Sequence, residues 1–450
     1  APEEITITLD DGNGHTVEII VAKDATTGTG EWIASADEYN YLAVGESATV
    51  NFGVTPSENS FEELIFDGLY YTVSVEGEND DVAINPVGTD SSGAVTEDLN
   101  VSLGKLSDSG ALAFIDLDLS DVHTATVEAD PDNALAGELI LGAVTEAANT
   151  TNGLIGWTYK VDNSAVQYLA KGQTTSESFS VTIADAHGSS VEQVVEVVVT
   201  GVNDGPDISV QTGDSASAGL TEAIAAAGVA SAGLTATGKL TVRDVDITDT
   251  VDVLVESVSL SGTGNSFKPG TINTTTALPM LSLTQGALGN EAELDALGNI
   301  TWAFDSGKVG FDYLQAGETQ VFTYVLKAKD TAGATDTQTV TITVTGTQDI
   351  AKISGEAQAT ATEKGGFLNN SYAALYNGIT GLTEPPAGNY SLVGGKLDVV
   401  DLDHDHAFFI AKTETTQYGT FQIGTDGKWT YQLNDSSAAV EALGKGDRKI

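Results

Sequence analysis

The stretch Trp157-Thr158-Tyr159-Lys160-Val161-Asp162 is followed shortly by the turn Leu169-Ala170-Lys171-Gly172. The same pairing of a tryptophan with a Leu-x-x-Gly turn occurs four times in the 450 residues. The tryptophans, at spacings of 125, 145 and 127 residues, are Trp32, Trp157, Trp302 and Trp429. The turns end at Gly45, Gly172, Gly317 and Gly446. Repetition at this period predicts a tandem array in which each repeat buries its own core.

Between these landmarks, β-branched and polar residues alternate as in half-buried strands. We expect strands at residues 5–9, 179–183, 191–200, 321–327 and 339–345. The one helical candidate, residues 222–232, is interrupted by Gly228 and should form at most a single turn. Short strands with frequent turns predict an all-β chain of tandem β-sandwiches. Each tryptophan is expected to fill the core of its sandwich.

Three related tripeptides close the β-rich runs and mark the ends of repeats: Glu78-Asn79-Asp80, Val202-Asn203-Asp204 and Thr347-Gln348-Asp349. They predict a partial first repeat at 1–81, a second at 82–205, a third at 206–349 and a C-terminally incomplete fourth at 350–450. The third repeat carries extra length at residues 257–281 and the fourth at residues 367–390. Insertions of this length are either decoration or recognition surface.

Acidic residues dominate the composition. Aspartate and glutamate total 65 against 18 lysines and arginines, and the formal net charge is −47. The electrostatic field of so negative a chain repels nucleic acid and anionic membranes and attracts cations. Cysteine is absent, so neither disulfides nor thiolate metal sites hold the fold. No stretch approaches the roughly 18 to 20 apolar residues of a membrane span. We therefore expect no nucleic-acid partner and no membrane insertion by this segment.

Three Asp-x-Asp pairs lie in matching places after the predicted boundaries: Asp116-Leu117-Asp118, Asp244-Val245-Asp246 and Asp401-Leu402-Asp403. A further acid follows each pair: Asp121, Asp249 or Asp405. Two carboxylates at one strand end repel each other unless a cation lies between them. Oxygen donors in a cysteine-free chain favour calcium over zinc or copper. A single pair is more often a solvated turn, but three pairs in one register favour metal sites.

Each repeat offers two more acidic positions. A turn aspartate stands late in the first three repeats, as Asp67, Asp185 and Asp330. A glutamate stands early in the second, third and fourth, as Glu97, Glu222 and Glu363. If the termini of a sandwich lie at opposite ends, the preceding linker, the Asp-x-Asp pair and the late aspartate meet at one end. The early glutamate then faces the following junction.

The chain resembles the VCBS family of cadherin-like repeats, which occur in long RTX-type adhesins and related bacterial surface proteins. The resemblance is carried by Gly201-Val202-Asn203-Asp204-Gly205-Pro206, by the stretches at 157–162 and 169–172, and by the Asp-x-Asp pairs. It covers nearly the whole chain. It implies Ig/cadherin-like sandwiches that form an elongated rod, with calcium bound at the junctions between repeats by residues of the linker and of both flanking domains.

Carried over residue by residue, the resemblance implies three sets of calcium ligands. The first junction would use Asn79, Asp80, Asp116, Asp118 and Asp185. The second would use Glu97, Asn203, Asp204, Asp244, Asp246 and Asp330. The third would use Glu222, Asp349, Asp401 and Asp403. Gln348 replaces the linker asparagine at the third junction, which departs from the pattern.

Other kinds of site find less support. His404 and His406 lie close together and make a transition-metal site conceivable, although the calcium interpretation is preferred. The chain contains no nucleophile elbow, phosphate loop or His-Glu-x-x-His motif, so we expect that it is not an enzyme.

The predicted function is that of a calcium-stiffened spacer or adhesin segment, extracellular and either secreted or on a bacterial surface, serving adhesion or biofilm formation. Its expected partners are neighbouring repeats of the same longer chain. One alternative is a module that binds a glycan or a surface protein through the insertions of repeats three and four. Another is a self-assembling filament, sheath or surface layer, in which the two incomplete end repeats complete each other by strand donation.

Overall fold

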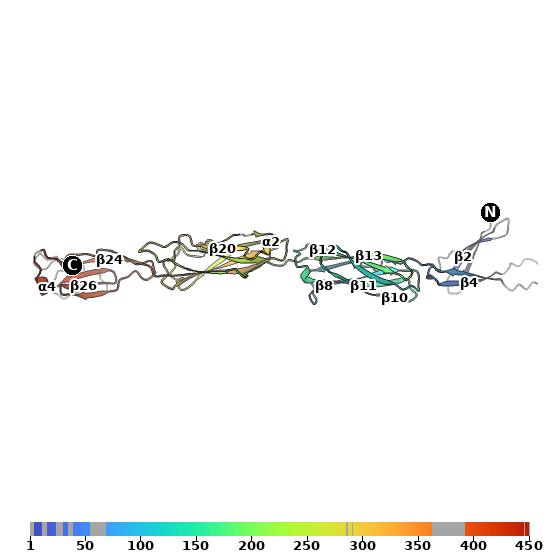
Figure 1. The fold of residues 1–450 in the computed structure, drawn as a ribbon, viewed down its shortest axis with the longest axis horizontal. Coiled ribbons are helices and arrows are strands. Elements are labelled where there is room, and N and C mark those ends of the chain that lie inside the picture. The colour runs from blue at the N-terminus through green and yellow to red at the C-terminus, as the bar shows by residue number, and fades with distance from the viewer. Residues whose placement is uncertain are drawn as a thin grey trace, which may run out of the picture. The chain divides into compact units, whose positions relative to one another are not determined.

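The computed structural model describes residues 4–10, 16–23, 30–34, 39–54, 69–284, 287–289, 291–361, 392–444 and 446–449. Strands dominate these residues (Figure 1). The chain divides into two compact units, Ala1–Asp204 with Val245–Ile247, and Gly205–Asp244 with Thr248–Ile450. The helices among the described residues are single turns: η2 (Asn163–Ala165), α1 (Thr274–Ala277), η3 (Leu278–Met280), α2 (Glu291–Leu294) and α4 (Ala438–Glu441).

The first unit opens with two small antiparallel sheets. One has the order β1 (Glu4–Asp10), β2 (Thr16–Lys23), β3 (Gly30–Ala34), and the other pairs β4 (Ser47–Val54) with β5 (Leu69–Glu76). A β-sandwich follows. Its strands are β6 (Ala83–Ile84), β7 (Ser92–Thr96), β8 (Lys105–Ile115), β9 (Thr124–Ala129), β10 (Glu138–Glu146), β11 (Asn152–Asp162), β12 (Thr174–Ala184) and β13 (Ser190–Thr200). They form two sheets, β10-β11-β8-β6 and β7-β13-β12-β9.

The second unit holds another sandwich and one further sheet. The sandwich strands are β14 (Asp207–Ser209), β15 (Ser217–Thr221), β16 (Thr235–Arg243), β17 (Val251–Ser261), β18 (Leu281–Thr284), β19 (Ala287–Leu288), β20 (Ile300–Asp305), β21 (Thr319–Lys329) and β22 (Thr335–Thr345). They form the sheets β14-β16-β20-β18 and β15-β22-β21-β17-β19. The further strands are β23 (Lys352–Gly355), β24 (Leu392–Val400), β25 (Lys412–Thr415), β26 (Gly419–Ile423) and β27 (Lys428–Leu433), in the order β23-β24-β27-β26-β25.

The sequence-based expectations about secondary structure are confirmed. All five expected strands lie within β1, β12, β13, β21 and β22, and residues 222–232 form no helix. Among the described strands, no sheet joins residues from both sides of positions 81, 205 or 349. The repeat boundaries themselves stay a prediction.

An early strand of each sandwich pairs in parallel with the last strand of that sandwich. β7 pairs with β13 from Ser92↔Glu196 to Thr96↔Thr200, and β15 pairs with β22 from Ser217↔Thr341 to Thr221↔Thr345. Because paired parallel strands run in the same direction, the chain enters each sandwich at one end and leaves it at the other. This topology places the early glutamate, just after β7 or β15, at the same end as the outgoing linker.

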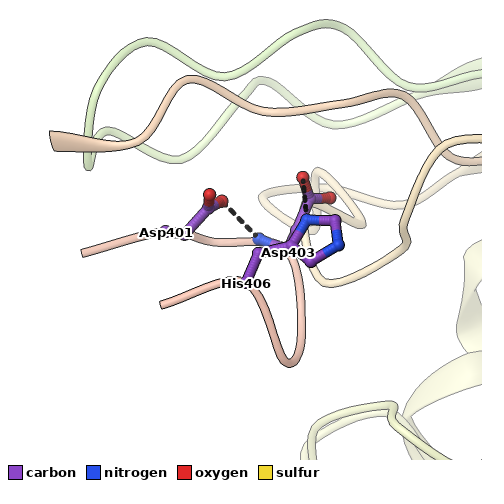
Figure 2. Close-up of side chains that lie close together, drawn as sticks. All are labelled: Asp401, Asp403 and His406. Atoms are coloured by element: carbon purple, nitrogen blue, oxygen red, sulfur yellow. Dashed lines mark hydrogen bonds and ion pairs between the residues drawn. The ribbon is translucent and has the colours of Figure 1, made fainter. Parts of the chain in front are cut away.

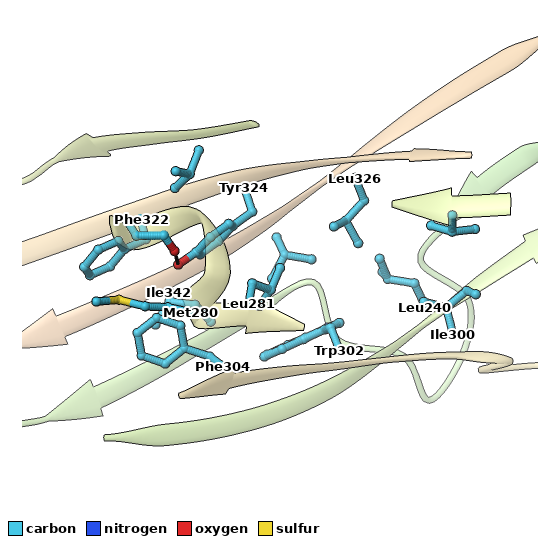
Figure 3. Packing of buried hydrophobic residues seen from close by; sticks show 14 of the residues in the cluster. Leu240, Met280, Leu281, Ile300, Trp302, Phe304, Phe322, Tyr324, Leu326 and Ile342 are labelled. Atoms are coloured by element: carbon cyan, nitrogen blue, oxygen red, sulfur yellow. Dashed lines mark hydrogen bonds between the residues drawn. The ribbon is translucent and has the colours of Figure 1, made fainter. Parts of the chain in front are cut away.

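Each sandwich has a core of its own, built around a tryptophan. Trp157 is 2% exposed and Trp302 is 0% exposed. Figure 3 shows Trp302 among the apolar side chains between the two sheets of its sandwich. The indole N–H groups of Trp157, Trp302 and Trp429 donate to the carbonyl oxygens of Asp90, Ser215 and Glu356 at 2.7, 2.8 and 2.6 Å. The expected core role is confirmed for these three, whereas the Trp32 side chain lies outside the described residues.

The Leu-x-x-Gly turns are confirmed by backbone geometry. Their glycines have φ values of 84°, 76°, 82° and 97°, the left-handed region in which glycine avoids Cβ strain. A second glycine, just before each linker tripeptide, packs against the turn. A Cβ on Gly201 would lie 2.2 Å from the carbonyl oxygen of Leu169. Gly77 and Gly346 meet comparable backbone contacts at 2.2 and 2.4 Å.

Replacement of Gly201 by alanine is expected to lower the free energy of unfolding by about 1–3 kcal/mol, because the added methyl group meets backbone that cannot move aside. Gly156 in β11 is the matched control, since a Cβ there would lie 4.0 Å from its nearest neighbour. Urea denaturation of the two variants measures the difference. Equal stability of Gly201→Ala and Gly156→Ala would contradict the prediction.

Candidate metal centres

The Asp-x-Asp pairs directly follow β8, β16 and β24, and each second aspartate holds the linker backbone in the same way. The backbone N–H of the linker aspartate donates to a carboxylate oxygen of that residue. The pairs are Asp80 to Asp118 at 2.9 Å, Asp204 to Asp246 at 3.0 Å, and Asp349 to Asp403 at 2.9 Å. Asp118 and Asp403 also donate from their own backbone N–H to the first aspartate of the pair, at 2.9 and 3.1 Å.

In the first unit, oxygens of Asp116, Asp121 and Asp185 lie within 4.8 Å of one another. The Asn79 side-chain amide donates to Asp185 at 3.1 Å and brings the linker to this cluster. Asn79 Oδ1 and Asp118 Oδ1 are buried and lack a hydrogen-bond donor among the described residues. The structure therefore brings together four of the predicted first-junction ligands and adds Asp121, which was not among them.

Burial and mutual repulsion decide the electrostatics of this cluster. The pKa of Asp118 is raised to about 6, mainly by burial and also by the charges of Asp116, Asp121 and Asp80, while the hydrogen bond from the Asp80 N–H acts in the opposite direction. Burial also raises the pKa of Asp80, followed by the charges of Asp116 and Asp81. Burial acts in the same direction on Asp185, but hydrogen bonds from Asn79 and from three backbone N–H groups outweigh it and lower the pKa of that carboxyl.

Asp116 has a partner that the sequence did not indicate. His123 lies 2.9 Å from Asp116 Oδ2 through Nε2 and 2.7 Å from Glu146 through Nδ1. Burial lowers the pKa of His123, but these two hydrogen bonds outweigh it and raise the pKa overall. A carboxylate offers about four lone-pair positions, so Asp116 can bond His123 and still bind a cation. His123 thus positions Asp116 within the cluster.

In the second unit, Glu222, Asp349 and Asp403 are 3%, 5% and 2% exposed. One oxygen of each accepts a backbone hydrogen bond: Glu222 from Thr347 and Asp349 from Ala225, both at 2.7 Å, and Asp403 from Asp349. The other oxygen of each is buried and lacks a hydrogen-bond donor among the described residues. Three carboxylates that the sequence assigned to the third junction therefore carry unsatisfied buried oxygens, which is costly without a cation.

The two described early glutamates differ in their neighbours. The pKa of Glu222 is raised to about 8, mainly by burial and also by the charges of Asp349, Asp312 and Asp403, while the hydrogen bond from the Thr347 N–H acts in the opposite direction. Burial raises the pKa of Glu97 only to about 7. Glu97 accepts a hydrogen bond from Gln167 at 2.7 Å, whereas the residue in the corresponding place beside Glu222 is the acid Asp312. Sequence reasoning missed Asp312.

The residues predicted for the second junction fall in different units. In the first unit, Glu97 accepts from the Val202 backbone N–H at 2.8 Å. Burial, followed by the Asp98 charge, raises the pKa of Asp204. In the second unit, burial followed by the Asp330 charge raises the pKa of Asp249. The remaining predicted ligands, Asn203 and Asp246 in the first unit and Asp244 in the second, are partnered as well.

One backbone contact that the sequence did not indicate recurs in the structure. The residue after each Asp-x-Asp pair donates its N–H to the carbonyl of the tyrosine that precedes a Leu-x-x-Gly turn. Leu119 donates to Tyr41 at 3.2 Å, Ile247 to Tyr168 at 3.4 Å, and His404 to Tyr313 at 3.3 Å. The Tyr-Leu dipeptides at 41, 168 and 313 are the signal that could have revealed this contact.

The insertion at residues 257–281 serves packing over much of its length. Ala277 and Met280 are buried in the core, and the Ala277 carbonyl accepts from the Tyr324 hydroxyl at 2.9 Å. Phe267 stacks on His404 with ring centroids 3.5 Å apart. His404 also contacts Glu318 at 2.8 Å, so this insertion joins the Asp401 loop to the preceding sandwich. Asp67, Glu363 and the insertion at 367–390 lie outside the described residues.

Asp405, the acid that follows the third pair, has a φ of 59°, and its side chain is 78% exposed. It is offset by one position from Asp121 in the first pair. His406 occupies the matching position, five residues after the first aspartate of its pair, and clusters with Asp401 and Asp403.

No model of a protein family matches the chain, and no curated protein matches it. None of the helices in the described parts is long and apolar enough to cross a membrane. Solved structures that match include PcdhgB3 EC1-4, with 10% identity over 98% of this chain and 85% of the other, at a TM-score of 0.36. The protocadherin gammaB7 EC3-6 cis-dimer structure shares 13% identity over 100% and 87%, at 0.32. Mouse protocadherin-24 EC1-3 shares 13% over 72% and 86%, at 0.28. Matches at such low scores carry no argument, and the all-β architecture of tandem sandwiches rests on the strands and sheets described above.

Proposed function

We propose that the chain is a segment of an extracellular spacer or adhesin, secreted or on a bacterial surface, in which calcium fixes the linkers between successive β-sandwiches. Buried carboxylate oxygens that lack a donor among the described residues support this role, above all Asp118 Oδ1 in the first unit and Glu222 Oε2 and Asp349 Oδ2 in the second. Calcium supplies two positive charges and accepts six to eight oxygen ligands. Function is then mechanical and not enzymatic.

The chain's own residues prepare these positions for a cation. The second aspartate of each pair holds a linker N–H with one oxygen, so the linker and its ligands move together. The proposed calcium ligands in the first unit are Asn79, Asp80, Asp116, Asp118, Asp121 and Asp185, and those at the fourth-repeat boundary are Glu222 and Asp349, while Asp401 and Asp403 hold the metal of their own loop. The residues in matching register, Glu97, Asn203, Asp204, Asp244, Asp246, Asp249 and Asp330, are proposed ligands as well.

Small-angle X-ray scattering tests the proposal on the full chain, first in millimolar calcium and then in excess chelator, with constant moderate salt to hold screening fixed. We expect one well-defined extended profile with calcium and a broad distribution of shapes without it, because repelling carboxylates then separate at the linkers. Magnesium at equal concentration is the control for divalent charge. A profile that chelation leaves unchanged would refute calcium stiffening.

A further inference from the structure

The third Asp-x-Asp loop differs from the other two at one chemically decisive position. Residues 116–121 read Asp-Leu-Asp-Leu-Ser-Asp and 244–249 read Asp-Val-Asp-Ile-Thr-Asp, whereas 401–406 read Asp-Leu-Asp-His-Asp-His. A ring nitrogen of His406 and one oxygen each of Asp401 and Asp403 lie within 4.8 Å of one another. Figure 2 shows the imidazole beside the Asp403 carboxylate, and His406 Nδ1 lies 3.6 Å from Asp403 Oδ2.

A second replacement accompanies the first. Gln348 stands where the other linkers carry asparagine. Its side-chain amide donates to Asp403 at 2.5 Å and lies 3.1 Å from His406 Nδ1. In the first unit the corresponding Asn79 amide instead reaches the late aspartate, Asp185. The longer glutamine therefore holds the imidazole next to the carboxylate.

An unsatisfied buried group points to a bound ion at this loop. Asp403 is 2% exposed, and its Oδ1 is buried and lacks a hydrogen-bond donor among the described residues. Sites made only of oxygen suit calcium, whereas replacing a carboxylate by an imidazole removes one negative charge and adds a borderline-soft nitrogen. Two carboxylates and one imidazole form a donor set typical of zinc and its neighbours in the first transition row.

We propose that Asp401, Asp403 and His406 bind a divalent transition metal of the zinc class, so that this loop prefers a different metal from the loops at 116–121 and 244–249. The contrast with calcium rests on the proposed function, but the binding of zinc does not. One linker of the array is then held by a different kind of ion from the others.

Isothermal titration of the metal-free full chain with zinc chloride, at pH 7.5 and in millimolar calcium, tests the assignment. We expect one zinc ion to bind. His406→Asp should lower the zinc affinity by at least about tenfold, because even the loss of a residue that only supports a metal ligand lowers the affinity of a metal site by about that factor. His187→Asn is the control, because His187 lies 3.0 Å from Asp121 at the first cluster and leaves the third loop intact. The reciprocal variant Asp121→His should create a second zinc site.

The outcomes separate this inference from the proposed function. Unchanged zinc binding in His406→Asp, or loss of zinc binding in His187→Asn, would overturn the assignment. Failure of the unmodified chain to bind zinc, together with calcium-dependent scattering, would overturn this inference and leave the proposed function standing. If the chain binds zinc but its scattering profile does not change with calcium, the proposed function would be overturned and this inference would stand.

Discussion

Replacement of Trp302 by alanine is expected to lower the free energy of unfolding of its sandwich by about 3–5 kcal/mol. The side chain is 0% exposed, and its indole N–H donates to the Ser215 carbonyl at 2.8 Å. The indole also covers Gly238, where a Cβ would lie 2.2 Å from the ring. Alanine would leave a cavity between the sheets and remove the donor to Ser215, and the surrounding strands cannot close that space.

Differential scanning calorimetry of the full chain measures this loss. Trp157→Ala is the matched control, because Trp157 has the same buried position and the same kind of carbonyl bond in the other sandwich. Since each sandwich has its own core, each substitution should lower one transition and leave the other nearly unchanged. A common shift of both transitions in either variant would show that the sandwiches unfold as one cooperative unit.

Without bound metal, the chain is expected to lose stability as the pH rises from about 5 to 8. Burial, followed by the charges of Asp349, Asp312 and Asp403, raises the pKa of Glu222 from 4.5 to about 8. Burial raises the pKa of Glu97 to about 7 and that of Asp118 from 3.8 to about 6. At pH values between the unfolded and folded pKa of these groups, the folded state binds more protons than the unfolded state. The stability that these groups contribute is therefore fully present below their unfolded pKa and is lost as the pH rises through their folded pKa.

Melting temperatures of the metal-free chain at pH 5, 6.5 and 8 test this prediction. Calcium should reverse most of the loss at pH 8, since it replaces the protons as the positive charge among the carboxylates. Glu222→Gln should raise the metal-free melting temperature at pH 8 and reduce the gain from calcium, whereas exposed Asp162→Asn should do neither. A metal-free melting temperature that climbs with pH would contradict the electrostatic argument.

The sequence was sufficient for the strands and for the buried positions of Trp157, Trp302 and Trp429, because these depend on local alternation and on a period visible in the chain. It also named the residue types around the linkers. It could not show that Asp121 meets Asp185, since the two are brought together by the pairing of β12 with β9, far apart in sequence. Nor could it reveal that Asp312 faces Glu222, because a lone aspartate in a turn carries no signal of its neighbours.

The parallel pairing of β7 with β13, and of β15 with β22, determines how each sandwich responds to a pulling force. The chain enters beside the outgoing strand and leaves at the far end, so a pull on both ends slides the two strands past each other along their length. All five residue pairs of β7 and β13, from Ser92↔Glu196 to Thr96↔Thr200, then bear the load together. A hairpin pulled open from one end breaks its hydrogen bonds one after another. Rupture in shear is therefore a slow event, governed by the unfolding rate and not by the equilibrium stability.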